Sequence, residues 1–101
     1  MSKFSLTLLC PPSVEEKLLD LLLDAVGDDE VFTSMPTFSH GLAHGRLSNE
    51  EQVMGRSASA QFQVIVTDAE MTALLQRLRD EFRGTGMRYW ASPLAAEGEI
   101  E

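Results

Sequence analysis

Two kinds of hydrophobic periodicity divide the chain into six segments. Apolar and polar residues alternate in four of them, which are residues 4–10, 31–39, 57–67 and 87–94. A period of two residues is typical of β-strands. In residues 14–25 and 71–82, apolar side chains recur every three or four positions, which predicts two amphipathic helices. The predicted order is strand, helix, strand, strand, helix, strand.

Local signals set the ends of these elements. Ser-Val-Glu-Glu at 13–16 and Thr-Asp-Ala-Glu at 67–70 both fit a capping box, in which the hydroxyl and the fourth residue's carboxylate satisfy each other's backbone N–H groups. Gly27 and Gly84 follow the two helices, where glycine is common. Pro36 indicates an edge or bulged second strand, because proline cannot donate to a ladder.

The repeated strand–helix–strand unit predicts the fold. We expect an α+β fold: a ferredoxin-like βαββαβ sandwich, a four-stranded antiparallel sheet with two helices on one face. Residues 1–101 form a single domain in this interpretation, because so short a chain leaves no room for a second core. Residues 40–56 are polar and rich in glycine, which predicts a long flexible loop. Residues 95–101 predict a loose acidic tail.

The helices of such a fold leave one face of the sheet uncovered. Residues 4–9 and 87–94 are largely apolar on both predicted strand faces, whereas Ser and Gln alternate with apolar residues through 57–63. An exposed apolar sheet face usually marks an interface. We therefore expect an oligomer that closes over this face.

The composition excludes several classes of protein. The chain has 8 Lys and Arg against 16 Asp and Glu, for a net charge of -8. Nucleic acids and anionic membranes attract basic patches, so neither is an expected partner. No apolar run reaches the roughly 18 residues that span a bilayer, and no signal-peptide pattern is present, so we expect no membrane insertion. The single cysteine, Cys10, excludes an internal disulfide and fits a cytoplasmic location, although its role is not indicated.

Three elements resemble a small proteobacterial family of PII-like proteins of unknown function. They are Leu-Thr-Leu-Leu-Cys-Pro-Pro at 6–12 with the helix start after it, Glu-Gln-Val-Met-Gly-Arg at 51–56 with Gln-Phe-Gln-Val at 61–64, and Tyr-Trp-Ala-Ser-Pro-Leu at 89–94. The resemblance covers nearly the whole chain. It implies a ferredoxin-like subunit in a PII-like or CutA-like homotrimer, with residues 40–56 in the place of the loop through which PII proteins contact partners.

The resemblance also implies a regulatory or signalling role. Members of the family are often encoded beside heavy-metal efflux systems, which implies a link to heavy-metal resistance and a protein partner such as an efflux component. PII proteins bind adenine nucleotides between subunits. Residues 83–88 here lack the longer Gly- and Lys-rich phosphate-binding stretch of those proteins, which argues against nucleotide binding.

We therefore interpret the chain as a PII-like regulatory protein and not an enzyme, with the 40–56 loop contacting a partner or a small ligand. The candidate contact residues are Arg46, Glu51, Gln52 and Arg56. A guanidinium at Arg56 can clamp a carboxylate or phosphate through two hydrogen bonds. The favoured alternative for Arg56 is an ion pair with Glu50 or Glu51 that holds the base of the loop.

The first alternative function is direct metal binding or metal sensing through His40 and His44. Imidazole suits divalent ions such as Zn²⁺, Cu²⁺ and Ni²⁺. Two imidazoles make an incomplete site, and only Glu50, Glu51 or Cys10 are candidates for a third ligand. Loop histidines without a bound ion are the commoner case.

An enzyme of the dimeric ferredoxin-like barrel class is the least favoured interpretation. The predicted helix faces are aliphatic, and the chain has no G-x-S-x-G, Walker A or C-x-x-C motif. The sequence does not identify the ligand, the metal or the protein partner.

Overall fold

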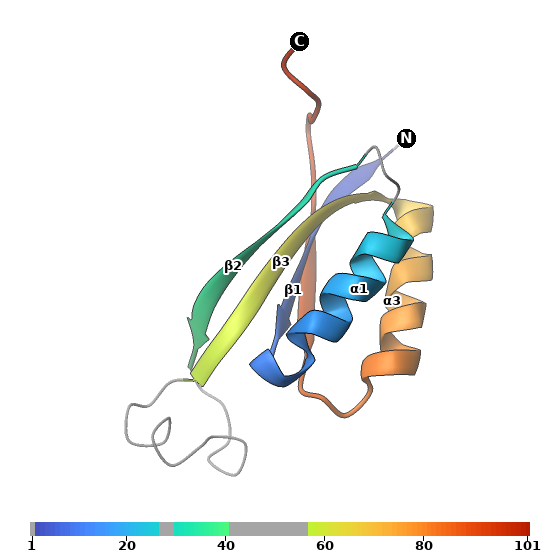
Figure 1. Cartoon of the computed structure of the whole chain (residues 1–101). Coiled ribbons are helices and arrows are strands. Elements are labelled where there is room, and N and C mark those ends of the chain that lie inside the picture. The colour runs from blue at the N-terminus through green and yellow to red at the C-terminus, as the bar shows by residue number, and fades with distance from the viewer. Residues whose placement is uncertain (1, 27–29, 41–56) are drawn as a thin grey trace.

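The structure is a computed structural model that describes residues 2–26, 30–40 and 57–101 (Figure 1). The elements are β1 (Lys3–Cys10), the 3₁₀ turn η1 (Pro12–Val14), α1 (Glu15–Ala25), β2 (Phe32–Ser39), β3 (Ser57–Thr67), α3 (Asp68–Phe82) and β4 (Arg88–Pro93). Figure 1 shows α1 and α3 on the same face of one twisted sheet. The predicted α+β ferredoxin-like sandwich is confirmed.

The first strand lies at the centre of the sheet. The strand order is β2-β3-β1-β4, and all neighbouring strands are antiparallel. Leu8 of β1 lies opposite Phe62 of β3 and Tyr89 of β4. Pro36 lies in β2, which is an edge strand as its proline predicts.

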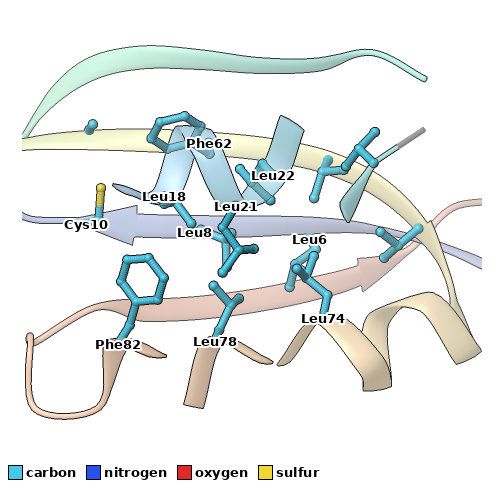
Figure 2. Packing of buried hydrophobic residues seen from close by; sticks show 14 residues of the cluster. Leu6, Leu8, Cys10, Leu18, Leu21, Leu22, Phe62, Leu74, Leu78 and Phe82 are labelled. Atoms are coloured by element: carbon cyan, nitrogen blue, oxygen red, sulfur yellow. The ribbon is translucent and has the colours of Figure 1, made fainter. Parts of the chain in front are cut away.

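The core lies between the sheet and the two helices. Leu6 and Leu8 of β1 are fully buried, and Phe62 of β3 is 1% exposed. Figure 2 shows these side chains meeting leucines of α1 and α3. β2 contributes no residue to the buried cluster in the described part of the chain, although Phe32 packs against it with its ring centroid 6.4 Å from that of Phe62.

The two predicted capping boxes have different outcomes. At Thr67 the box is confirmed, because the Glu70 N–H donates to Thr67 Oγ1 at 3.2 Å and the Thr67 N–H donates to Glu70 Oε1 at 2.8 Å. At Ser13 the prediction is wrong. The N-cap of α1 is Val14 and makes no side-chain capping bond. Ser13 instead lies inside η1, where the Val14 N–H donates to the Pro11 carbonyl at 3.2 Å.

The end of α1 also differs from the prediction. Ala25 was expected on the buried face but is exposed, and Val26 is buried in its place. The backbone at Val26 has already become extended, with φ -90° and ψ 127°, which turns this side chain back toward the core. Gly27 lies outside the described residues. Gly84 confirms its prediction, because it follows α3 with φ +82°.

The open face of the sheet is more polar than the sequence suggested. The strand pairing places Ser5, Thr7 and Leu9 of β1 opposite Ser92, Trp90 and Arg88 of β4. The outward faces of these strands therefore mix polar and apolar residues, and the expectation of a largely apolar face is wrong. Strand register, which the sequence alone did not fix, decides which side chains share this face.

The C-terminal residues match the predicted loose tail only in part, because some of them interact with the start of the chain. The Leu94 N–H donates to the Lys3 carbonyl at 3.0 Å, and the Lys3 ammonium pairs with Glu97. Residues 98–101 are exposed. Of the predicted 40–56 loop, only His40 lies within the described residues. Within that part of the chain, no helix has the length and apolar character to span a membrane.

The capping geometry predicts opposite results for two matched substitutions. Thr67→Ala should lower the free energy of unfolding by about 1 kcal/mol, because it leaves the Glu70 N–H without its side-chain acceptor. Ser13→Ala should change it by no more than a few tenths, because Ser13 caps nothing. Urea unfolding followed by circular dichroism measures both. Equal losses in the two variants would contradict the 3₁₀ start of α1.

The same capping box predicts an acid dependence. Hydrogen bonds from the Thr67 N–H and hydroxyl lower the pKa of Glu70 below its ordinary value of 4.5. This stabilisation is therefore present above the ordinary value and is lost as the pH falls through the lowered one. The difference in stability between wild type and Glu70→Gln, which keeps an acceptor but removes the charge, should therefore shrink below pH 4.5.

Candidate functional site

A pocket of about 350 Å³ opens at one end of the sheet, where β1 and β2 end and β3 begins. Four segments far apart in the sequence line it. They are residues 9–13, Ser39, residues 57–59 and the link from α3 to β4. In Figure 1 this is the end of the sheet at which β2 and β3 meet the grey trace. The pocket therefore joins all four strand ends.

Serine hydroxyls form one wall of this pocket. Ser39 and Ser59 place their Oγ atoms 2.7 Å apart, within hydrogen-bond distance. Ser57 is only 6% exposed, and its Oγ has no hydrogen-bond partner among the described residues. A buried hydroxyl without a partner costs free energy. Ser57 Oγ therefore marks a position where a polar atom of a ligand would be stabilised.

The opposite wall is the tight link between α3 and β4. Gly84 and Gly86 have φ values of +82° and +85°, a conformation that favours glycine. A Cβ at Gly84 would meet no atom within 4 Å, so backbone conformation and not space requires glycine there. Thr85 closes the turn, because its N–H and its Oγ1 both donate to the Phe82 carbonyl, at 3.2 and 2.7 Å.

The pocket is suited to a small anion. Arg88 lines it together with serine hydroxyls, and none of the described lining residues is acidic. Hydroxyl groups donate hydrogen bonds to anionic oxygens, and a guanidinium adds charge-assisted ones.

Cys10 also lines the pocket but is a poor nucleophile at neutral pH. The residue is 1% exposed. Burial raises the pKa of its thiol from 9.0 to about 11, and the nearby Glu15 carboxylate adds to the rise. The thiolate is the form that attacks or ligates. Its thiol is therefore almost entirely protonated in the folded protein at neutral pH.

The structure locates one of the six residues predicted from the sequence. His40 follows β2 and is exposed. The other predicted contacts and ligands lie outside the described residues; they are His44, Arg46, Glu51, Gln52 and Arg56. No group of three or more His, Cys, Asp or Glu residues that could hold a metal occurs in residues 2–26, 30–40 and 57–101.

Sequence reasoning missed the residues that build the pocket. They are Ser39, Ser57, Thr85 and Arg88. Ser39 and Ser57 are separated by the whole 40–56 segment, so only the pairing of β2 with β3 brings them together. The one available signal was the Gly-Thr-Gly sequence at 84–86 before Arg88, between a helix and a strand.

Comparisons with known proteins agree with the fold. The model of a family described as "protein of unknown function (DUF3240)" matches residues 1–101. No curated protein matches the sequence. A crystal structure of a DUF3240 family protein from Shewanella baltica OS155 superposes with a TM-score of 0.78 at 17% identity, over 100% of this chain and 99% of the other.

Two further solved structures share the same architecture. CPII from Thiomonas intermedia K12, a nitrogen regulatory PII-like protein bound to ADP, AMP and bicarbonate, gives a TM-score of 0.72 at 16% identity, over 99% of this chain and 98% of that one. The GlnK–ATP complex of B. subtilis gives 0.61 at 14% identity, over 93% and 83%. At this level of identity the likeness establishes the fold.

The burial of Cys10 predicts slow thiol chemistry in the folded protein. A rise of the pKa from 9.0 to about 11 leaves roughly a hundredfold less thiolate at pH 8, and burial blocks access as well. Iodoacetamide should therefore label the urea-unfolded chain at least ~100-fold faster than the folded one. Mass spectrometry of quenched time points gives both rates. Similar rates would show that Cys10 is accessible.

Proposed function

The chain belongs to the DUF3240 family, and we propose that it is a PII-like regulatory protein, not an enzyme, that binds a small anion in the pocket at the end of the sheet. In this proposal residues 40–56 contact a protein partner, and binding of the anion in the pocket changes that contact. One observation supports the idea: Ser39 and Ser57, which directly flank that segment, both line the pocket.

The two serines give a ligand a direct physical connection to the segment. Ser39 lies opposite Ser57 as the last pair of the β2–β3 ladder. A ligand hydrogen-bonded to these hydroxyls would hold the two strand ends in one arrangement. A ligand can shift a conformational equilibrium only by its differential contacts with the two states, and contacts at these strand ends would supply them. The candidate partner contacts remain Arg46, Glu51, Gln52 and Arg56.

The chemistry of the pocket favours a small oxyanion over a nucleotide. CPII is bound to ADP, AMP and bicarbonate, which all carry anionic oxygens. Among the described residues the pocket offers one guanidinium, from Arg88, and the link holds no lysine. A single arginine and several hydroxyls match an ion of the size and charge of bicarbonate. They are a poor match for a diphosphate.

We further propose that three copies assemble through the open faces of their sheets. Four apolar residues lie among the Ser, Thr and Gln residues of this face; they are Leu9, Met35, Ile65 and Trp90. Trp90 is 49% exposed and Met35 is 53% exposed in the single chain. A mixed face of this kind, with an aromatic anchor, is common at protein interfaces.

The resemblance to proteins encoded beside efflux systems extends the proposal to the partner. We propose that the partner is a component of heavy-metal efflux and that residues 40–56 contact it. Direct metal binding through His40 and His44 is the alternative. Titration of Zn²⁺ into wild type and a His40→Ala/His44→Ala variant separates the two ideas, because only the alternative requires a difference.

The ligand proposal predicts selective loss of binding. Bicarbonate, AMP and ADP would be titrated by calorimetry into wild type and into Ser57→Ala and Arg88→Gln. Arg88→Gln should weaken bicarbonate binding about tenfold, since it removes a charge-assisted hydrogen bond. Ser57→Ala should also weaken it without loss of thermal stability, because the hydroxyl has no partner among the described residues in the free protein.

Lys3→Gln is the matched control, because it removes one positive charge at the other end of β1. It should bind bicarbonate like wild type. The proposal fails if none of the three anions binds, or if Ser57→Ala and Arg88→Gln bind them unchanged. Tighter binding of ADP than of bicarbonate would overturn only the preference for a small oxyanion.

The assembly proposal predicts a trimer in solution. Light scattering should give about three times the 11.2 kDa chain mass. Trp90→Glu should dissociate the trimer, because it places a charge in the interface, whereas Leu23→Glu on the outer surface of α1 should not. A wild-type monomer at high micromolar concentration would rule this assembly out.

A further inference from the structure

A second groove lies between α3 and β4, on the other side of the link that borders the first pocket. Its volume is about 230 Å³. The floor is apolar and includes Leu75, Leu78, Phe82, Met87 and Tyr89. Leu78 and Phe82 are buried, and Figure 2 shows both projecting from α3 toward the sheet. Tyr89 is 50% exposed, so part of this apolar surface faces solvent.

Three arginines line the same groove, and they are Arg79, Arg83 and Arg88. None of the three has an ion-pair partner among the described residues. The remaining described basic residues all have partners. Lys3 pairs with Glu97, and Arg77 pairs with Asp24 and Glu81. Lys17 donates to the Glu81 carbonyl at 2.9 Å and lies over the Phe82 ring.

The acidic residues nearest in sequence to Arg79 and Arg83 interact with other side chains. Glu81 bonds to Arg77 at 3.0 Å, and Asp80 accepts a hydrogen bond from Gln76 at 3.1 Å. Arg79 lies in the last turn of α3 and Arg83 is the residue that follows the helix, and both line the groove. A chain with twice as many acids as bases thus leaves its unpaired described arginines beside one apolar groove.

We propose that this groove binds a small amphiphilic carboxylate. The apolar body would lie against Leu75, Phe82 and Tyr89, and the carboxylate would face Arg79 and Arg83. Arginine binds carboxylates through two parallel hydrogen bonds, which fixes the orientation of the ligand. The groove is smaller than the pockets of about 300–1,000 Å³ that hold drug-sized ligands, which points to a short aliphatic or aryl-alkyl acid.

This site is independent of the proposed regulatory function. The two pockets share Gly84, Gly86 and Arg88 but use different walls. Ser57 belongs to the first pocket alone, and Arg79 and Arg83 belong to the groove alone. Substitutions at these positions therefore test the two sites separately.

Octanoate is the probe, titrated into the full chain by NMR and calorimetry. Acetate supplies the head group alone, and octanol supplies the apolar body alone. We expect saturable octanoate binding with chemical shift changes centred on residues 79–89, and weaker binding of both partial probes. Arg79→Gln/Arg83→Gln should weaken octanoate binding at least about tenfold. Tyr89→Ser should weaken it by removing apolar contact.

Arg77→Gln is the matched control, because Arg77 lies on the same helix and is engaged with Asp24 and Glu81. It should bind octanoate like wild type. All of these side chains are at least partly exposed, so the variants should fold, which their melting temperatures check. Equal octanoate affinity in the double variant and Arg77→Gln, or no saturable binding up to about 10 mM, overturns the proposal.

A second outcome would also overturn it. Ile100 is 97% exposed and lies between Glu99 and Glu101, so the acidic tail of another copy has similar chemistry. A peptide of residues 95–101 is titrated in parallel. If the peptide binds and depends on Arg79 and Arg83 while octanoate does not bind, the groove receives a peptide segment and not a small acid.

Discussion

The central position of β1 is the constraint on which the other elements depend. Its backbone groups pair with β3 on one side and β4 on the other, so it holds the two halves of the sheet together. On one face, the fully buried Leu6 and Leu8 form the floor on which α1 and α3 pack. On the other face, Thr7 is only 3% exposed. β3 is the other inner strand of the sheet, and β2 and β4 are both edge strands.

The same topology places both pockets at one end of the sheet. The ends of β1 and β2 and the starts of β3 and β4 all lie there, with the link from α3 to β4 between two pockets. Gly84 and Gly86 hold this link in a left-handed conformation that places Arg88 at the border of both. A change in the conformation of this link would therefore alter both pockets. Coupling between two binding sites requires such a shared element with two arrangements.

Side-chain periodicity was sufficient to predict the four strands and two α-helices within the described residues. β1, β3 and both helices bury one face in the core, whereas the edge strands β2 and β4 contribute no residue to the buried cluster that the described residues form. Thr67 was predicted correctly since it ends an extended strand, which is the backbone conformation of an N-cap. Ser13 was not, because the prolines before it begin a 3₁₀ turn that competes with capping. To predict which side chains share the open face with those of β4, one needs the register of β4 with β1. To predict the pocket, one needs the strand pairing that brings Ser39 and Ser57 together. Both depend on pairing between distant segments, which local pattern does not encode.

The position of β1 also has a consequence for biosynthesis. Lys3 lies opposite Thr67, and Phe4 lies opposite Pro93, so both partners of the earliest strand come from the later part of the chain. A ribosome must therefore translate as far as β3 before β1 can pair with another strand of this sheet. Until then the nascent chain carries an apolar strand with two unpaired edges, a form prone to aggregation. Such non-local pairing also slows folding. Of all its elements, β1 would gain most from a chaperone during translation.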